Sequence, residues 1–291
     1  MKDSLGERGF YTVNFVILTA AGLVCLLPLL HILAVSLSSN TAIATGKVSL
    51  WPVEPSWRAY ASMIEGTNIV RAFQNSLFIT AAGTAFNMLL TILAAYPLSK
   101  RQFYLRRFFT LSLVFTMLFK AGLIPDYMLV KSLHLVDSYW ALWLPGLISV
   151  YNMLLLRSFF TAIPEELEDA ARMDGCSEWK LILRIILPLS LPVIATLTLF
   201  YGVAHWNSFF NVMIYINDSN KYNLSVLVQN MIQSSTLLTE MSNLNPEDYQ
   251  MLTPESIKSA SVIVMTLPML VIYPFLQKYF VKGVMLGAVK G

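Results

Sequence analysis

Few residues in this sequence have the types and spacing that chemistry requires. The histidines (His31, His134, His205) are scattered, and the two cysteines, Cys25 and Cys176, are far apart. Neither set has the spacing of a metal site or a disulfide framework. No G-x-x-x-x-G-K-[ST] phosphate-binding motif occurs. We therefore expect no catalytic residue, no metal and no nucleotide cofactor in this chain, which is not expected to be an enzyme.

Lys120 is the most unusual polar residue, because it lies in the middle of an apolar stretch and is followed by Gly122 and Pro125. A charge inside a membrane helix costs roughly 3 kcal/mol on insertion scales, so it normally faces a cavity or a partner. We interpret Lys120 as a cationic lining for an anionic sugar such as a uronate. In the alternative, the helix starts deeper and Lys120 extends to the outer interface.

A second group of candidates combines aromatic rings with amides. His205, Trp206 and Asn207 are consecutive, with Phe209 close behind. Aromatic rings stack on sugar faces and amides bond hydroxyls, so this group suits a saccharide pathway, and Asn152 is a weaker candidate of the same kind. The alternative is that these side chains pack and hydrogen-bond between membrane helices.

The composition indicates that these residues are positioned by membrane helices. Hydrophobic residues make up 56% of the 291 residues and charged residues 13%, against about a quarter charged in soluble domains. A bilayer core needs roughly 20 apolar residues in a helix. Six stretches qualify: Phe15–Ser36, Ala72–Leu98, Phe108–Val130, Ala141–Phe160, Ile186–Tyr215 and Val262–Val281. The fifth contains Pro188 and Pro192 and is expected to start with a bend.

The basic residues predict the orientation of these spans. Thirteen lysines and arginines lie on the side of the two termini and six on the opposite side, which places both termini in the cytoplasm. The net charge of +3 is small and spread along the chain, so we expect no nucleic acid partner. The outer side then carries a large polar loop, residues 217–260, which either contacts a partner, caps a pore or is a solvated surface.

The segment after the fourth stretch has the pattern of two short helices. Pro164 suits a first helical position, and the acidic residues after it suit the positive end of the helix dipole. Gly175 suits a left-handed terminating residue, and Ser177 can cap a second helix that leads to Pro188. Leu167, Ala170 and Ala171 share one small apolar face. A lipid-bound helix would have bulky apolar and basic residues, so this acidic, alanine-containing helix favours docking into a protein groove.

This segment resembles the EAA loop of ABC-importer permeases. The resemblance rests on Glu168-Asp169-Ala170-Ala171, Asp174-Gly175 and Ile186-x-Pro188, although Asp169 stands where Glu or Ala is frequent. The motif Tyr139-Trp140-Ala141-Leu142 and the C-terminal Gly287–Gly291 extend the similarity over essentially the whole chain. The family fold is all-α, with six transmembrane helices and a cytoplasmic coupling helix, so residues 1–291 are expected to be one permease domain of the type I importer class.

The resemblance also implies partners and contact residues. Residues 161–188 are expected to form the coupling loop that sits in a cleft of a separate ATPase dimer, which would bind ATP and Mg. A second permease subunit and an extracytoplasmic solute-binding protein complete such systems in the bacterial inner membrane. The expected coupling contacts are Glu168, Ala170, Ala171, Asp174 and Gly175. In maltose-type relatives the tail enters the ATPase dimer interface, which here would involve Val289, Lys290 and Gly291.

The start of the chain, with Leu29-Leu30-His31 and Ser36–Asn40, is similar to the branch that handles oligosaccharides such as alginate or pectin fragments. We therefore expect an oligosaccharide importer. The alternatives are a permease for another small solute and a self-contained channel or secondary transporter. A secondary transporter would need intramembrane carboxylates or an inverted repeat, and the apolar stretches contain no acidic residue apart from edge residues such as Asp126.

Overall fold

The computed structural model describes residues 5–233 and 254–288, and every regular element in those ranges is a helix. The chain divides into two units, Met1–Val70 with Val228–Pro268 and Arg71–Leu227 with Met269–Gly291. The expectation of an all-α protein is confirmed for the described residues. The expected tail contacts, Val289, Lys290 and Gly291, lie outside them.

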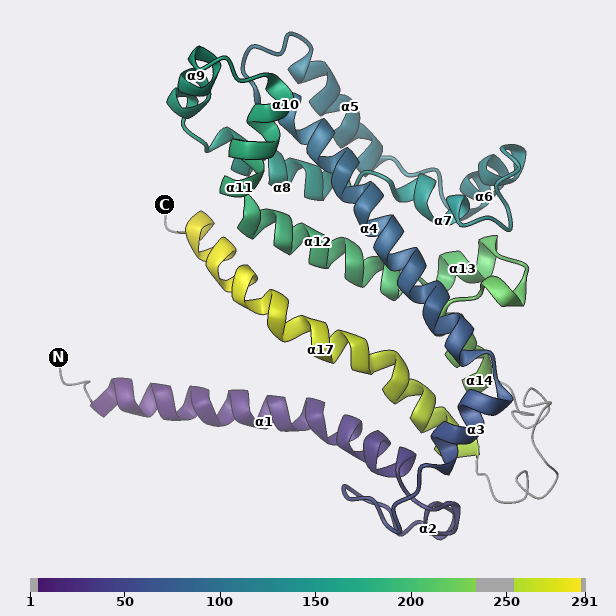
Figure 1. The fold of residues 1–291 in the computed structure, drawn as a ribbon. Helices are drawn as coiled ribbons and strands as arrows, with labels where there is room; N and C mark the ends of the chain where they lie inside the picture. Colours follow the sequence, from purple (N-terminus) through teal and green to yellow (C-terminus); the bar gives the residue numbers. More distant parts are fainter. Residues whose placement is uncertain (1–4, 234–253, 289–291) are drawn as a thin grey trace. The chain divides into compact units, whose positions relative to one another are not determined.

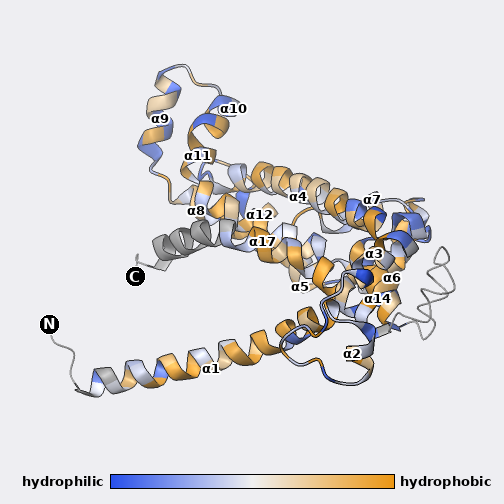
Figure 2. Cartoon of the chain, turned by 60° about the horizontal axis from the view of Figure 1, so that its bottom comes forward, coloured by the Kyte–Doolittle hydropathy of each residue, from blue (hydrophilic) through white to orange (hydrophobic). Residues whose placement is uncertain are grey.

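The first unit contains the N-terminal helix and the helices that follow it (Figure 1). The most apolar window of its first helix has no residue buried within the chain, and most of this helix has the colour of hydrophobic residues (Figure 2). Such a surface is suited to lipid. Apart from the first two residues of α4, the helices that lie wholly or partly in this unit are α1 (Leu5–Ser36), α2 (Asn40–Ala44), α3 (Arg58–Gly66), α14 (Leu224–Gln233) and α17 (Pro254–Ala288).

A buried serine, Ser261, lies in the small core of this first unit. The Ser261 hydroxyl donates to the Ile257 carbonyl at 2.7 Å and contacts the sulfurs of Met63 and Met231 at 3.4 and 3.6 Å. A serine bonded back to its own helix satisfies its hydroxyl without interrupting the helix. Ser261 therefore lets α3, α14 and α17 pack closely on one another.

The second unit contains the other helices. One of its hydrophobic clusters lies between α4, α8, α10 and α12, and another lies between α4, α7 and α13. α9 and α10 lie beside the C-terminal end of α4 (Figure 1). The helices are α4 (Ile69–Ser99), α5 (Arg106–Leu118), α6 (Leu123–Ser132), α7 (Trp140–Trp143), η1 (Leu144–Gly146), α8 (Val150–Thr161), α9 (Glu165–Met173), α10 (Glu178–Leu181), the π-helical turn η2 (Ile182–Ile186), α11 (Leu187–Leu189), α12 (Leu191–Trp206), α13 (Phe209–Tyr215) and η3 (Ser219–Lys221).

Among residues 5–233 and 254–288, three helical stretches are continuous and are long and apolar enough to cross a membrane: Gly9–Ser36, Ile69–Ser99 and Glu255–Pro274. They contain or overlap the predicted first, second and sixth spans. Three further candidates are pairs of helices with a sharp bend between them, of 114° after α5, 54° after η1 and 85° after α11. The part of the chain that the structure describes has up to six spans if each bent pair crosses once.

The continuous third span, Phe108–Val130, is a wrong prediction. α5 ends at Leu118, and Gly122 has a φ of 92° before α6 begins. A positive φ is easy for glycine and interrupts a right-handed helix, and Pro125 fits the first turn of the new helix. The bend at the start of the fifth span is confirmed, but that helix ends at Trp206 rather than Tyr215.

The large loop predicted at residues 217–260 is partly helical. η3 and α14 lie in its first half, and α17 already begins at Pro254. The Lys221 ammonium donates to the Asp137 carboxylate and to its backbone carbonyl, both at 2.8 Å. These bonds hold the start of the segment against the turn that precedes α7.

Candidate functional site

The segment between α8 and α12 forms two short helices, as the sequence predicts. Pro164 is extended, and α9 begins at the next residue with three acidic residues in its first turn. At the other end Gly175 has a φ of 76°, and the Cys176 N–H donates to the Ala171 carbonyl at 3.0 Å. Such a left-handed residue ends a helix because it lets the following N–H groups bond the last carbonyls. Ser177 occupies the N-cap position of α10, but its side chain makes no capping bond there.

The inner face of α9 is formed by Glu168 and Ala171. Both are buried within the chain, and Ala171 belongs to the core between α4, α8, α10 and α12. The sequence predicts both as direct contacts to a partner. In the structure they hold α9 on its own chain, because the axial rotation of the helix turns them inward.

The exposed side of α9 and α10 carries several apolar side chains as well as acidic residues such as Glu166. Leu167 and Ala170 lie on it, and 88% of Met173 is exposed. Beyond Gly175, Trp179 of α10 and Leu183 of the following turn η2 are also exposed. The predicted contacts Ala170, Asp174 and Gly175 are exposed as well. We call Leu167, Ala170, Met173, Trp179 and Leu183 the outer face; exposed clusters of large apolar side chains mark interaction surfaces.

An ionic network links the inner face of α9 to the end of α4. Lys100 pairs with one oxygen of Glu168, and Arg172 lies 3.5 Å from the other oxygen. Arg172 also donates to Glu178 at 3.1 Å, and the Tyr96 hydroxyl donates to Glu178 at 2.6 Å. The hydrogen bond to Glu178 raises the pKa of the Arg172 guanidinium above its ordinary value, so Arg172 stays charged.

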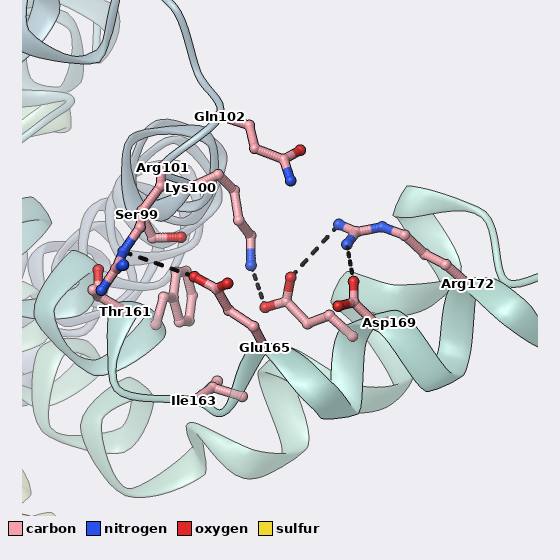
Figure 3. A pocket seen from close by; sticks show the side chains of 11 residues that line it. Ser99, Lys100, Arg101, Gln102, Thr161, Ile163, Glu165, Asp169 and Arg172 are labelled. Carbon is pink, nitrogen blue, oxygen red and sulfur yellow. Dashed lines mark hydrogen bonds and ion pairs between the residues drawn. The ribbon is translucent and has the colours of Figure 1, made fainter.

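This network borders a cavity of about 110 Å³ (Figure 3). In Figure 3, Lys100 and Arg172 approach the same carboxylate from opposite sides, and Arg101 extends toward Glu165 separately. The cavity is lined by Ser99, Lys100, Arg101, Gln102, Phe160, Thr161, Ile163, Glu165, Glu168, Asp169 and Arg172. The lysine and arginine side chains of the lining lie close to its carboxylates, and the attraction between these charges stabilises the walls of the cavity.

Comparisons with known proteins identify this chain's family. Residues 87–286, more than half of the chain, match the family described as binding-protein-dependent transport system inner membrane component. The chain belongs to this family. It is a membrane-embedded transport permease, and its predicted fold, that of an ABC-importer permease, is confirmed.

Relatives and a solved structure agree with this assignment over the whole permease. It is 41% identical to the polygalacturonan/rhamnogalacturonan transport system permease protein YtcP of Bacillus subtilis, covering 100% of both chains. It is 40% identical to protein LplC of the same organism, covering 100% of this chain and 98% of LplC. A solved bacterial ABC transporter involved in the import of the acidic polysaccharide alginate matches with a TM-score of 0.88 and 29% identity, covering 96% of this chain and 99% of the other.

The predicted solute-pathway residues have different surroundings in the permease. Lys120 is exposed in the break between α5 and α6, and Asn207 is exposed at the end of α12. Trp206 is buried, and its ring contacts Phe73 edge-on. Asn152 is buried in the first turn of α8. Trp206 and Asn152 are therefore part of the packing, whereas Lys120 and Asn207 stay accessible.

His205 is used in a helix-to-helix contact. Its Nε2 atom lies 2.8 Å from the Asn87 side-chain oxygen, and the Asn87 amide donates to the Gly146 and Leu147 carbonyls at 2.6 and 3.2 Å. These carbonyls are released by the bend between η1 and α8. The packing interpretation of His205 therefore fits the structure, because Asn87 and His205 together satisfy polar groups at this bend.

Sequence reasoning did not assign roles to Tyr96, Lys100 and Glu178. Lys100 is one of the basic residues that predict the orientation, and Tyr96 lies in an apolar stretch. The available signal is charge complementarity: a basic segment follows α4, and an acidic helix lies on the same predicted side of the membrane. The sequence alone does not predict which basic side chain pairs with which acidic one, because the pairing depends on how α9 is rotated about its axis.

Proposed function

We propose that this permease imports acidic oligosaccharides and that its α9–α10 segment couples it to a separate ATP-binding subunit. The proposal that the substrate is an acidic oligosaccharide rests mainly on the similarity to the alginate transporter over 96% of the chain. The relative YtcP is named for polygalacturonan and rhamnogalacturonan. Alginate and polygalacturonan are both polymers of uronic acids, so the two comparisons point to the same chemistry.

The proposed assembly has the partners that the family implies. A second permease subunit, an ATP-binding dimer that holds ATP and Mg, and an extracytoplasmic solute-binding protein work with this chain. A solved alginate transporter in complex with an alginate pentasaccharide-bound periplasmic protein has the same fold at a TM-score of 0.51 and 16% identity, covering 92% of this chain and 93% of the other. The excess of basic residues beside α4 and α9 supports a cytoplasmic position for α9 and both termini.

The outer face supports the coupling role. It is apolar and free within the chain, whereas the inner face is fixed by burial and ion pairs. A helix that is fixed on one side and exposed on the other suits transfer of force from a docked partner. Ala170, Asp174 and Gly175 are the proposed contacts, and Glu168 and Ala171 set their position.

Replacement of Gly175 by leucine tests the coupling role. A Cβ atom there would meet no other atom within 4 Å, but the φ of 76° makes any side chain strained, at a cost of about 1–2 kcal/mol. Gly46→Leu is the matched control, because Gly46 has a φ of 67° and equally open space outside the segment. We expect both variants to insert, and only Gly175→Leu to lose ATP-driven uptake in proteoliposomes that contain the whole transporter. Normal uptake by Gly175→Leu would refute the coupling role.

Replacement of Lys120 by glutamine tests the substrate class. Uptake of an oligogalacturonate should fall while uptake of a neutral oligosaccharide of equal length does not, because only the first carries carboxylates for Lys120 to attract. Lys131→Gln is the control, since Lys131 is also exposed and lies on the following helix α6. Equal loss for both sugars, or no loss, would rule out Lys120 as an anion-selective residue.

Uptake by the wild-type chain in the absence of ATP and of an ATP-binding subunit would indicate a secondary transporter instead of an ATP-driven importer.

A further inference from the structure

The ionic network described above is a closed ring that starts and ends on α4. From Tyr96 it passes to Glu178, to Arg172, to Glu168 and to Lys100. The ring closes because the Lys100 ammonium lies over the Tyr96 ring, 4.6 Å from its centroid. Residues from α4, α9 and α10 and from the segment after α4 therefore share one set of contacts.

The central carboxylate of this ring is buried. Only 5% of the Glu168 side chain is exposed, and its two oxygens face Lys100 and Arg172. A buried carboxylate must be paired, and removal of one partner leaves an uncompensated charge. The neighbouring pair of Arg101 with Glu165 differs: its atoms are 3.8 Å apart, and its side chains are 81% and 76% exposed. Exposed pairs of this kind contribute little.

The backbone on both sides of α9 leaves this helix dependent on such contacts. Pro164 is extended before it, and Gly175 takes a left-handed conformation after it. A force on the outer face could therefore tilt α9 about these two joints without moving the membrane helices. The ring opposes that tilt, because tilting would pull Glu168 away from Lys100 while the Glu168 carboxylate is still buried.

We propose that Lys100 is a positioning residue that locks α9 and α10 to the end of α4, so that a pull on the outer face moves α4 with it. This inference rests on the coupling role proposed above. Lys100 needs no contact with the ATP-binding subunit for this role. Its loss leaves the outer face intact and affects how completely the pull is transmitted.

The test compares charge loss with charge retention at Lys100 in the complete transporter, reconstituted with its ATP-binding and solute-binding partners. Lys100→Met should lower the amount of solute imported per ATP hydrolysed by roughly fivefold or more, while the rate of ATP hydrolysis and the recovery of the complex stay near wild type. Lys100→Arg should retain the ratio. Arg101→Met removes the adjacent exposed charge and should leave the ratio unchanged.

Two further variants examine the ring itself. Glu168→Gln combined with Lys100→Met should lower the ratio by less than the two single changes added together, because the two side chains share one ion pair, while Glu168 also pairs with Arg172. Tyr96→Phe opens the ring at Glu178 but keeps the pair of Lys100 with Glu168, and it should also lower the ratio. Tyr96→Phe keeps the inference testable if Lys100→Met does not assemble.

The outcomes separate this inference from the proposed function. If the wild-type transporter hydrolyses ATP without importing solute, the proposed function itself fails. If the wild type couples the two processes and Lys100→Met matches Arg101→Met, the locking role of Lys100 is wrong. A fully additive double variant, or an unchanged ratio in Tyr96→Phe, would overturn the closed ring.

Discussion

The contact between α4 and α12 depends on the absence of a side chain at Gly83. A Cβ atom there would lie 2.6 Å from His205 Nε2 and 2.7 Å from Cε1, far closer than a real contact. Gly83→Ala must therefore push the imidazole away, and the displaced ring loses its bond to Asn87. The carbonyls of the bend after η1 depend on the same asparagine.

The expected cost has two parts. Overpacking a close-packed site costs about 1–3 kcal/mol, and an interhelical hydrogen bond in a membrane protein is worth about 0.6 kcal/mol, with a maximum of about 1.7. We expect Gly83→Ala to lower the free energy of unfolding by about 2–4 kcal/mol on these grounds. In a His205→Ala background the methyl group has space, so the added cost of Gly83→Ala should be close to zero.

Equilibrium unfolding of the purified permease in mixed detergent micelles measures all four members of this cycle. Gly202→Ala is the matched control, because a Cβ atom at Gly202 meets its nearest neighbour, Thr84 Oγ1, at an ordinary 3.8 Å. It should stay within about 0.5 kcal/mol of wild type. The reasoning is refuted if Gly83→Ala is as mild as Gly202→Ala, or if its cost is unchanged when His205 is absent.

Two further predictions concern other contacts in the same unit. The Tyr201 hydroxyl lies 2.7 Å from the Thr91 hydroxyl and accepts a hydrogen bond from the Ser149 N–H at 3.2 Å. Tyr201→Phe leaves both groups without this partner and should lower the free energy of unfolding by about 1–2 kcal/mol in the same assay. An unchanged stability would contradict these hydrogen bonds. The hydrogen bond from Lys221, followed by the Asp218 N–H, holds the pKa of Asp137 below its ordinary value. That stabilisation is complete above the ordinary carboxyl pKa of about 3.9 and is lost as pH falls through the lowered native value; Asp137→Asn should flatten the acid limb of stability against pH, and an unaltered limb would exclude the pair as its cause.

Long apolar stretches and the α9–α10 pattern were predictable because their signals are local. Twenty apolar residues suffice to indicate a membrane helix, and Pro164 and Gly175 mark the ends of α9 through backbone preferences alone. The interruption near Lys120 was harder to predict. Gly122 and Pro125 are tolerated inside membrane helices when neighbours satisfy the backbone, so the sequence permits both a bend and a continuous helix.

The sequence by itself determined the class of this protein: an all-α membrane permease with a short two-helix segment between its fourth and fifth apolar stretches. Only the tertiary structure decided which face of that segment is free. Ala170 and Ala171 are chemically identical neighbours, yet one is exposed and the other is in the core. The sequence predicts Glu168 as a coupling contact, whereas in the structure its carboxylate is buried between Lys100 and Arg172. The physical reason is that local preferences set where a helix begins and ends, whereas its rotation and its ion pairs depend on residues distant in the chain.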